Sequence, residues 1–97
     1  MPFAEKPKIE SYSGTGVQAS VKIDPSMTCS LGINVDGDGD DVDLEVQVAP
    51  GGEWYALESG IVSPKVRANL GPINAVRLTI NTNNSGAIGF EVAQARM

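Results

Sequence analysis

The sequence predicts an all-β protein, with a single antiparallel β-sandwich or jelly-roll-like domain behind an extended N-terminal arm. Apolar and polar residues alternate along several stretches, as they do in strands with one buried and one wet face. Eleven glycines and six prolines interrupt these stretches, as the turns of a many-stranded fold require. No window of comparable length carries a helical stripe, and 97 residues suit one domain.

Residues 1–16, MPFAEKPKIESYSGTG, are expected to form the arm, and residues 17–97 the sandwich. The arm has no sustained periodicity, and its two prolines and closing Ser-Gly-Thr-Gly disfavour a helix. It could be a simple frayed terminus. Phe3, Ile9 and Tyr12 are apolar anchors that a solvated tail would not need, so docking on a neighbouring molecule is an equal alternative.

Three strands are predicted in the first half of the chain, within residues 17–23, 27–35 and 42–48. Each alternates strictly, so each is expected to bury one face. The residues expected to face inward are Val17, Ala19, Val21 and Ile23, then Met27, Cys29, Leu31, Ile33 and Val35, then Val42, Leu44, Val46 and Val48.

The second half continues this pattern less regularly. A short strand, EWYAL, follows the turn APGG, and Pro64 pushes residues 60–70 towards an edge or a loop. Strands follow at AVRLTINT and AIGFEVAQA, joined by the turn TNNSG. Their expected inward residues are Val76, Leu78, Ile80, Ile88, Phe90 and Val92. Six or seven such strands favour two facing antiparallel sheets.

The acidic stretch NVDGDGDDVDLEV raises the question of calcium. An EF-hand loop that starts at Asp36 would have Asp36, Asp38 and Asp40 at the ligand positions one, three and five. It would then require a glycine at position six and a glutamate at position twelve. Asp41 and Gln47 occupy those two positions, and the flanks alternate as strands, so this is not an EF-hand. The interpretation is an acidic hairpin tip, and weak calcium binding by Asp36, Asp38, Asp40 and Asp41 is the alternative.

Composition argues against several function classes. The net charge of −5 disfavours phosphate-mediated binding to nucleic acid. The single cysteine, Cys29, cannot form an intramolecular disulfide, and no histidine is present to activate it. No membrane-spanning or secretory apolar stretch is evident, so we expect a protein that is made and stays in a cytoplasm. No motif places Ser, Thr, Lys or carboxylates for catalysis, so we expect a protein that is not an enzyme, with no cofactor.

Sugar binding is a further possible function, because aromatic rings can stack on sugar faces. Trp54 and Tyr55 are adjacent, and on a strand they point to opposite faces. A core tryptophan beside a surface tyrosine is the favoured interpretation, and a glycan platform is the alternative.

VDLEVQVAPGGEWYAL, followed by AVRLTINTNNSGAIGFEV, resembles a pattern in small virion proteins of tailed bacteriophages. These are in particular the capsid decoration, or cement, proteins and related head or tail accessory β-domains. The resemblance covers residues 17–95 and consists of apolar alternation with a few punctuating residues. GGEW stands where an Asp-Gly-x-Thr-Trp turn is commoner.

The resemblance implies a non-enzymatic binder of the outer capsid surface whose partner is the major capsid protein. It also implies a homo-oligomer, with a trimer as the expected state, and an arm lying on coat subunits. Phe3, Ile9 and Tyr12 would then anchor the arm, while Lys6 and Lys8 would pair with coat carboxylates. A calcium- or glycan-binding β-sandwich module of a phage tail, fibre or cell-surface assembly is the alternative.

Overall fold

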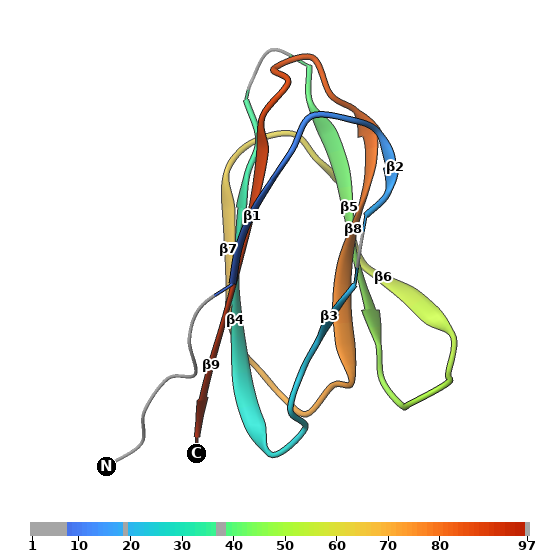
Figure 1. Ribbon diagram of the computed structural model, residues 1–97, viewed down its shortest axis with the longest axis vertical. Helices are drawn as coiled ribbons and strands as arrows, with labels where there is room; N and C mark the ends of the chain where they lie inside the picture. The colour runs from blue at the N-terminus through green and yellow to red at the C-terminus, as the bar shows by residue number, and fades with distance from the viewer. Residues whose placement is uncertain (1–7, 19, 37–38, 97) are drawn as a thin grey trace.

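The computed structural model describes residues 8–18, 20–36 and 39–96. In this part of the chain all regular elements are strands, arranged as two antiparallel sheets that face each other (Figure 1). The all-β prediction is confirmed, and the arrangement is sandwich-like. None of the described elements is a helix long and apolar enough to cross a membrane.

The first sheet contains four strands, and the second contains five. In spatial order the first is β1 (Lys8–Tyr12), β9 (Ile88–Arg96), β4 (Met27–Asn34) and β7 (Lys65–Leu70). The second is β2 (Gly16–Val17), β8 (Ala75–Thr82), β5 (Asp41–Gln47) and β6 (Trp54–Ile61), with β3 (Val21–Lys22) also paired to β8. Most neighbours in these sheets are therefore distant in sequence, and the pairing places the first and last strands, β1 and β9, side by side in the first sheet.

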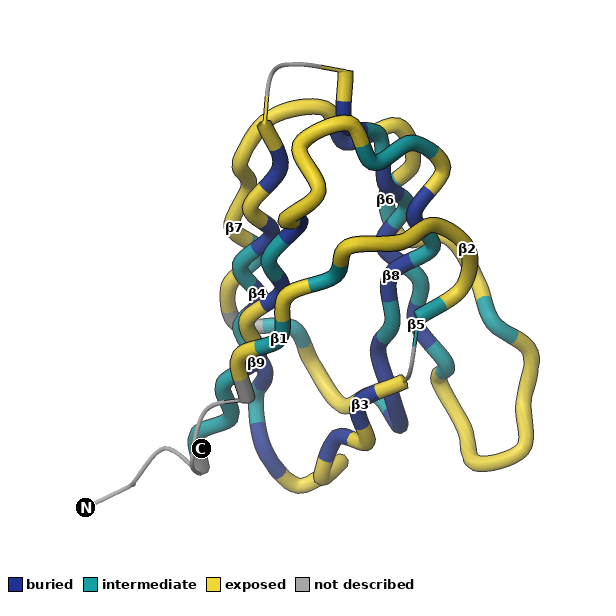
Figure 2. Tube along the Cα trace, turned by 45° about the horizontal axis from the view of Figure 1, so that its top comes forward, coloured by how far each residue is buried: buried dark blue, intermediate teal, exposed yellow. Residues whose placement is uncertain are grey.

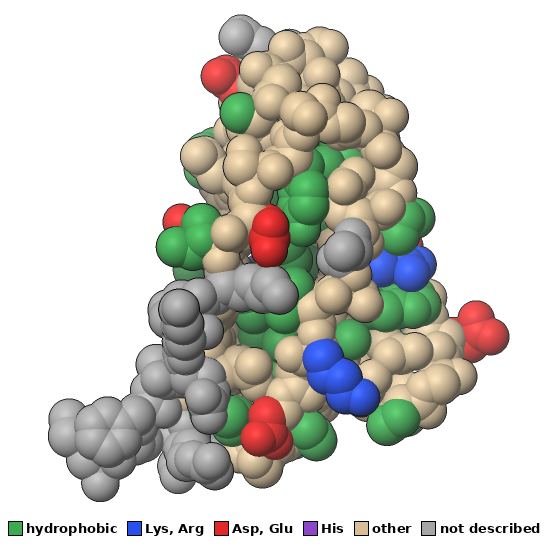
Figure 3. Space-filling view, in the orientation of Figure 1, with side chains coloured by type: hydrophobic (Ala, Val, Ile, Leu, Met, Phe, Trp, Pro, Cys, Tyr) green, Lys and Arg blue, Asp and Glu red, His purple; other side chains and the backbone are tan. Residues whose placement is uncertain are grey.

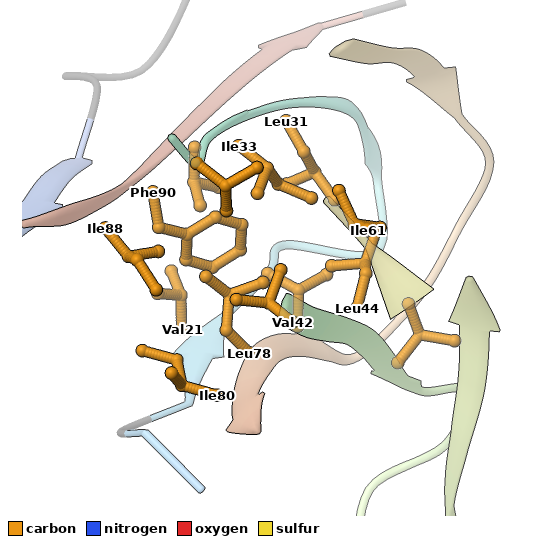
Figure 4. Close-up of a cluster of buried hydrophobic side chains, with 14 of the residues drawn as sticks. Val21, Leu31, Ile33, Val42, Leu44, Ile61, Leu78, Ile80, Ile88 and Phe90 are labelled. Carbon is orange, nitrogen blue, oxygen red and sulfur yellow. The ribbon is translucent and has the colours of Figure 1, made fainter. Parts of the chain in front are cut away.

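The alternation seen in the sequence produces the core. Along β4 and β5 buried residues alternate with more exposed ones (Figure 2). Because successive side chains of a strand point to opposite faces, the buried ones lie between the sheets and the others on the outer faces. Phe90 points into the centre of the cluster, among Ile33, Ile88 and Leu78 (Figure 4). Hydrophobic side chains are also visible between the sheets at the side nearest the viewer (Figure 3). Each fully buried aliphatic or aromatic side chain contributes about 1.5–3 kcal/mol to the free energy of unfolding.

The stretch 17–23 differs from its predicted single strand, because it forms two short strands, β2 and β3. Val17 pairs with Thr79 and Val21 pairs with Val76, so the chain advances by four positions here while β8 advances by three. A one-residue offset reverses the face that side chains point to. Val17, predicted to be buried, is therefore 58% exposed, whereas Val21 is in the core.

The expected arm also differs from the structure in part. Its residues Lys8–Tyr12 form β1, an edge strand paired with β9 over its whole length. Tyr12 packs against the core, and Ile9 points outward and is 70% exposed. Phe3 and Lys6 lie outside the described residues. We use the name leader for residues 1–7, which precede β1.

Cys29 lies on the inner face of β4 and is fully buried. Burial raises the pKa of its thiol to about 11. Because the thiolate is the reactive form, we expect native Cys29 to react with Ellman's reagent at least about a hundredfold more slowly than in the urea-unfolded chain. Equal rates in the two states would contradict the buried position.

Candidate functional site

The acidic loop, residues 36–41, connects β4 of the first sheet to β5 of the second, so it is not the hairpin tip that the sequence predicted. Its described part is organised around one carboxylate. Asp40 is fully buried, and the backbone N–H groups of Asp36, Asn84 and Ser85 donate to it at 3.0, 2.8 and 2.9 Å. The Ser85 hydroxyl adds a fourth bond of 2.6 Å. These donors, the Ser85 hydroxyl first, lower the pKa of Asp40 to about 2. Asp40 thus ties the acidic loop to the TNNSG turn between β8 and β9.

Asp36 and Asp41, the other calcium candidates in the described part of the chain, form no metal-ligand group with it. Asp36 is exposed, and Asp41 accepts a hydrogen bond from Asn81 at 3.3 Å. Asp38 lies outside the described residues. No group of three or more potential metal ligands occurs among the residues that the structure describes. Both oxygens of Asp40 already accept hydrogen bonds, so this carboxylate acts as a structural anchor of the loop.

Trp54 lies on the outer face of the second sheet and not in the core. It pairs with Gln47, whose side chain also faces outward, and the Arg77 guanidinium lies 4.1 Å from the centre of its ring. Arg77 in turn binds Glu45 at 2.9 Å. Such a cation–π contact stabilises by about 0.5–2 kcal/mol. Tyr55 points the opposite way and is 59% exposed, since the end of the β5–β6 hairpin extends away from the first sheet (Figure 1).

This arrangement bears on the glycan alternative. A sugar platform needs an open ring face, and Arg77 covers one face of Trp54. Val48, expected to be buried, is 60% exposed in the same hairpin, beyond the end of β5. The contact with Arg77 thus explains why the Trp54 ring is half-buried on the outer face of the second sheet.

The outer face of the first sheet carries an open, partly apolar surface. One cross-strand row runs over all four strands, because Ile9 pairs with Glu91, Glu91 with Gly32, and Gly32 with Val66. Ile9 and Val66, at the two ends of the row, are 70% and 74% exposed. Small residues on β4 and β9 adjoin the row, so the face is hollowed between two apolar walls.

Two hollows lie along this row, one on each side of Glu91. The larger, of about 500 Å³, extends towards Gly89 and Asn34, and the smaller, of about 400 Å³, extends towards Ser30 and Ala93. We call the row and its two hollows the outer trough. Exposed apolar walls around a hollow are typical of surfaces that bind another molecule.

Two of the arm residues that the sequence singled out, Ile9 and Tyr12, therefore lie in different surroundings. Ile9 forms one wall of the outer trough, whereas Tyr12 is half-buried against the core. Sequence reasoning missed Gly32, Val66 and Glu91, which come together through strand pairing between distant segments. A glycine on the outer face of an alternating strand was the available signal, because it leaves the face without a side chain.

Comparisons of the chain with protein-family models, with curated proteins and with solved structures give no match. The fold and the surfaces described above thus define the chain as a protein built of two facing antiparallel sheets.

Proposed function

We propose that this chain is a non-enzymatic structural protein of a bacteriophage virion. It would decorate and stabilise the capsid by binding coat subunits through its N-terminal arm and its sandwich surface. The observation that carries the proposal is the outer trough, with Ile9 and Val66 exposed on either side of a hollow. The resemblance of residues 17–95 to phage decoration proteins supports the same role.

The physical basis of such a role is multivalency. A 97-residue domain with one adhesive face offers limited binding energy as a single copy. Many copies on a symmetric shell, each also linked to its neighbours, act together and raise the avidity without new contacts. A closed trimer suits a threefold capsid position, so we keep that oligomeric state as part of the proposal.

The test is the stoichiometry of purified particles. We expect the chain to be present in a fixed ratio to the coat protein, measured by quantitative mass spectrometry, and to appear on the outer shell in electron micrographs. Deleting residues 1–7 should reduce incorporation at least about tenfold while the domain still folds, because β1 begins at Lys8. A few copies per particle would contradict the decoration role. Undiminished incorporation of the shortened chain would show that residues 1–7 are not needed for capsid binding.

A further inference from the structure

Glu91 stands in the outer trough without a cationic partner among the side chains that the structure describes. A Cβ built on Gly32 would lie 3.3 Å from its Oε2 atom, so the carboxylate lies over the glycine. Lys65 lines the same hollow, but its ammonium binds Glu58, as does the Arg67 guanidinium at 3.0 Å. The outer trough therefore matches a ligand that carries a cation.

The hollows beside Glu91 set a second requirement. Gly32 and Gly89 form part of the floor of the larger hollow, and Ile9 and Val66 form its apolar walls. A volume of about 500 Å³ has room for a large side chain. A suitable ligand thus offers a large apolar group next to its cation, and a chain in extended form would fit the length of the trough.

We propose that the outer trough binds the leader, residues 1–7, of a second copy of this chain. The leader MPFAEKP contains Phe3 and Lys6, flanked by two prolines. Prolines favour the polyproline II conformation, which has three residues per turn and a rise of about 3.1 Å per residue. In that conformation Phe3 and Lys6 lie on one side, about 9 Å apart. Lys6 pairs with Glu91, and Phe3 fills an adjoining hollow.

The leader reaches a second copy more readily than its own trough. Ile9, which forms the trough wall, follows Lys6 by three residues, and Lys8 already pairs with Val92 on β9. Pro7 also restricts Lys6 to extended backbone angles. Too few residues are left for the chain to reverse over its own sheet, whereas a neighbouring trough imposes no such restraint.

This inference rests on the arm as a binding element, as the proposed function does, and it names the receiving partner as a sister copy. In this inference the leader and the outer trough link neighbouring copies on the shell, in place of a direct contact between the arm and coat subunits. The rest of the sandwich surface then contacts the coat. Failure of one proposal can be distinguished from failure of the other. Leader exchange, the binding of one copy's leader to the trough of another, is measured on the purified chain without particles. Virion incorporation is measured independently on particles.

The experiment is sedimentation equilibrium of the full chain and five variants. We expect the full chain to self-associate, and deletion of residues 1–7 to abolish association. Glu91→Lys and Lys6→Glu should each raise the dissociation constant at least tenfold, and the double variant should recover to within about threefold of the parent. Glu53→Lys, an equal charge change at an exposed site between β5 and β6, should leave association unchanged.

A mixing experiment separates exchange between copies from docking within one copy. The leaderless chain keeps an intact trough, and the Glu91→Lys chain keeps an intact leader, so neither should associate alone but a mixture should form a complex. A synthetic peptide of residues 1–8 should bind the leaderless chain, and a Phe3→Ala peptide should bind at least tenfold more weakly. A full chain that stays monomeric at millimolar concentration, or a mixture that forms no complex, would overturn the proposal.

Discussion

Replacing Asp40 with alanine is expected to lower the melting temperature by about 10 °C or more. Four donors from three residues converge on this buried carboxylate, and the variant would leave them without an acceptor. Burying unsatisfied backbone N–H groups is costly, and bonds to a charged acceptor are stronger than neutral ones. The β8–β9 turn and the acidic loop would lose their connection.

The matched control is the neighbouring Asp41→Asn, which removes the same charge from a half-buried side chain with one long hydrogen bond. We expect this control to melt within a few degrees of the parent. The melting temperature of Asp40→Asn should lie between those of Asp40→Ala and Asp41→Asn. The asparagine amide keeps one accepting oxygen, but it turns an N–H₂ group towards other donors. Thermal melts followed by circular dichroism measure all three, and similar melting of Asp40→Ala and Asp41→Asn would contradict the anchoring role.

The same carboxylate predicts a pH dependence. The folded pKa of Asp40 is lowered to about 2 from an ordinary value of 3.8, so the folded state favours the ionised form. The resulting stability is fully present above pH 4 or so and is lost as the pH falls towards about 2. Melting temperatures recorded across this range should fall more steeply for the parent than for Asp40→Asn. Parallel curves would argue against a contribution of ionised Asp40 to stability.

Features that depend on neighbouring residues can be predicted from the sequence, whereas features that depend on pairing between distant strands cannot. Strict alternation predicted the inner faces of β4 and β5 residue by residue, because burial on a strand follows directly from side-chain direction. The offset between β2 and β3 depends on pairing with β8, so Val17 was assigned to the wrong face. Trp54 was expected in the core, but pairing with Gln47 places it outside.

The candidate surfaces depend even more on pairing between distant segments. Asp40 was recognised as one carboxylate of an acidic tip, whereas its partners Asn84 and Ser85 are more than forty residues away. The outer trough combines β1, β9, β4 and β7, whose order in the sheet cannot be obtained from alternation. Local sequence patterns therefore predict which face is wet, and the strand order decides which wet residues become neighbours.

Replacing Phe90 with alanine is expected to have the largest effect on the core, about 3–5 kcal/mol of the free energy of unfolding. Phe90 is fully buried, and its ring is the largest side chain among the fully buried ones that the structure describes. It projects from β9, the strand that joins β1 to β4, so the cavity would lie beneath the middle of the first sheet. A domain of this size is stable by about 5–15 kcal/mol, so the variant would lose much of its margin.

Urea unfolding followed by the fluorescence of the single tryptophan, Trp54, provides the measurement, because its ring lies under Arg77 outside the core cluster and does not contact the altered site. Phe90→Leu should lose less stability, since it retains part of the buried apolar volume. Val62→Ala, at a side chain that is 55% exposed, should change stability by less than about 0.5 kcal/mol. If Phe90→Ala shifted the urea midpoint no more than Val62→Ala does, the two sheets could not be packed around the Phe90 ring, and the facing arrangement itself would be wrong.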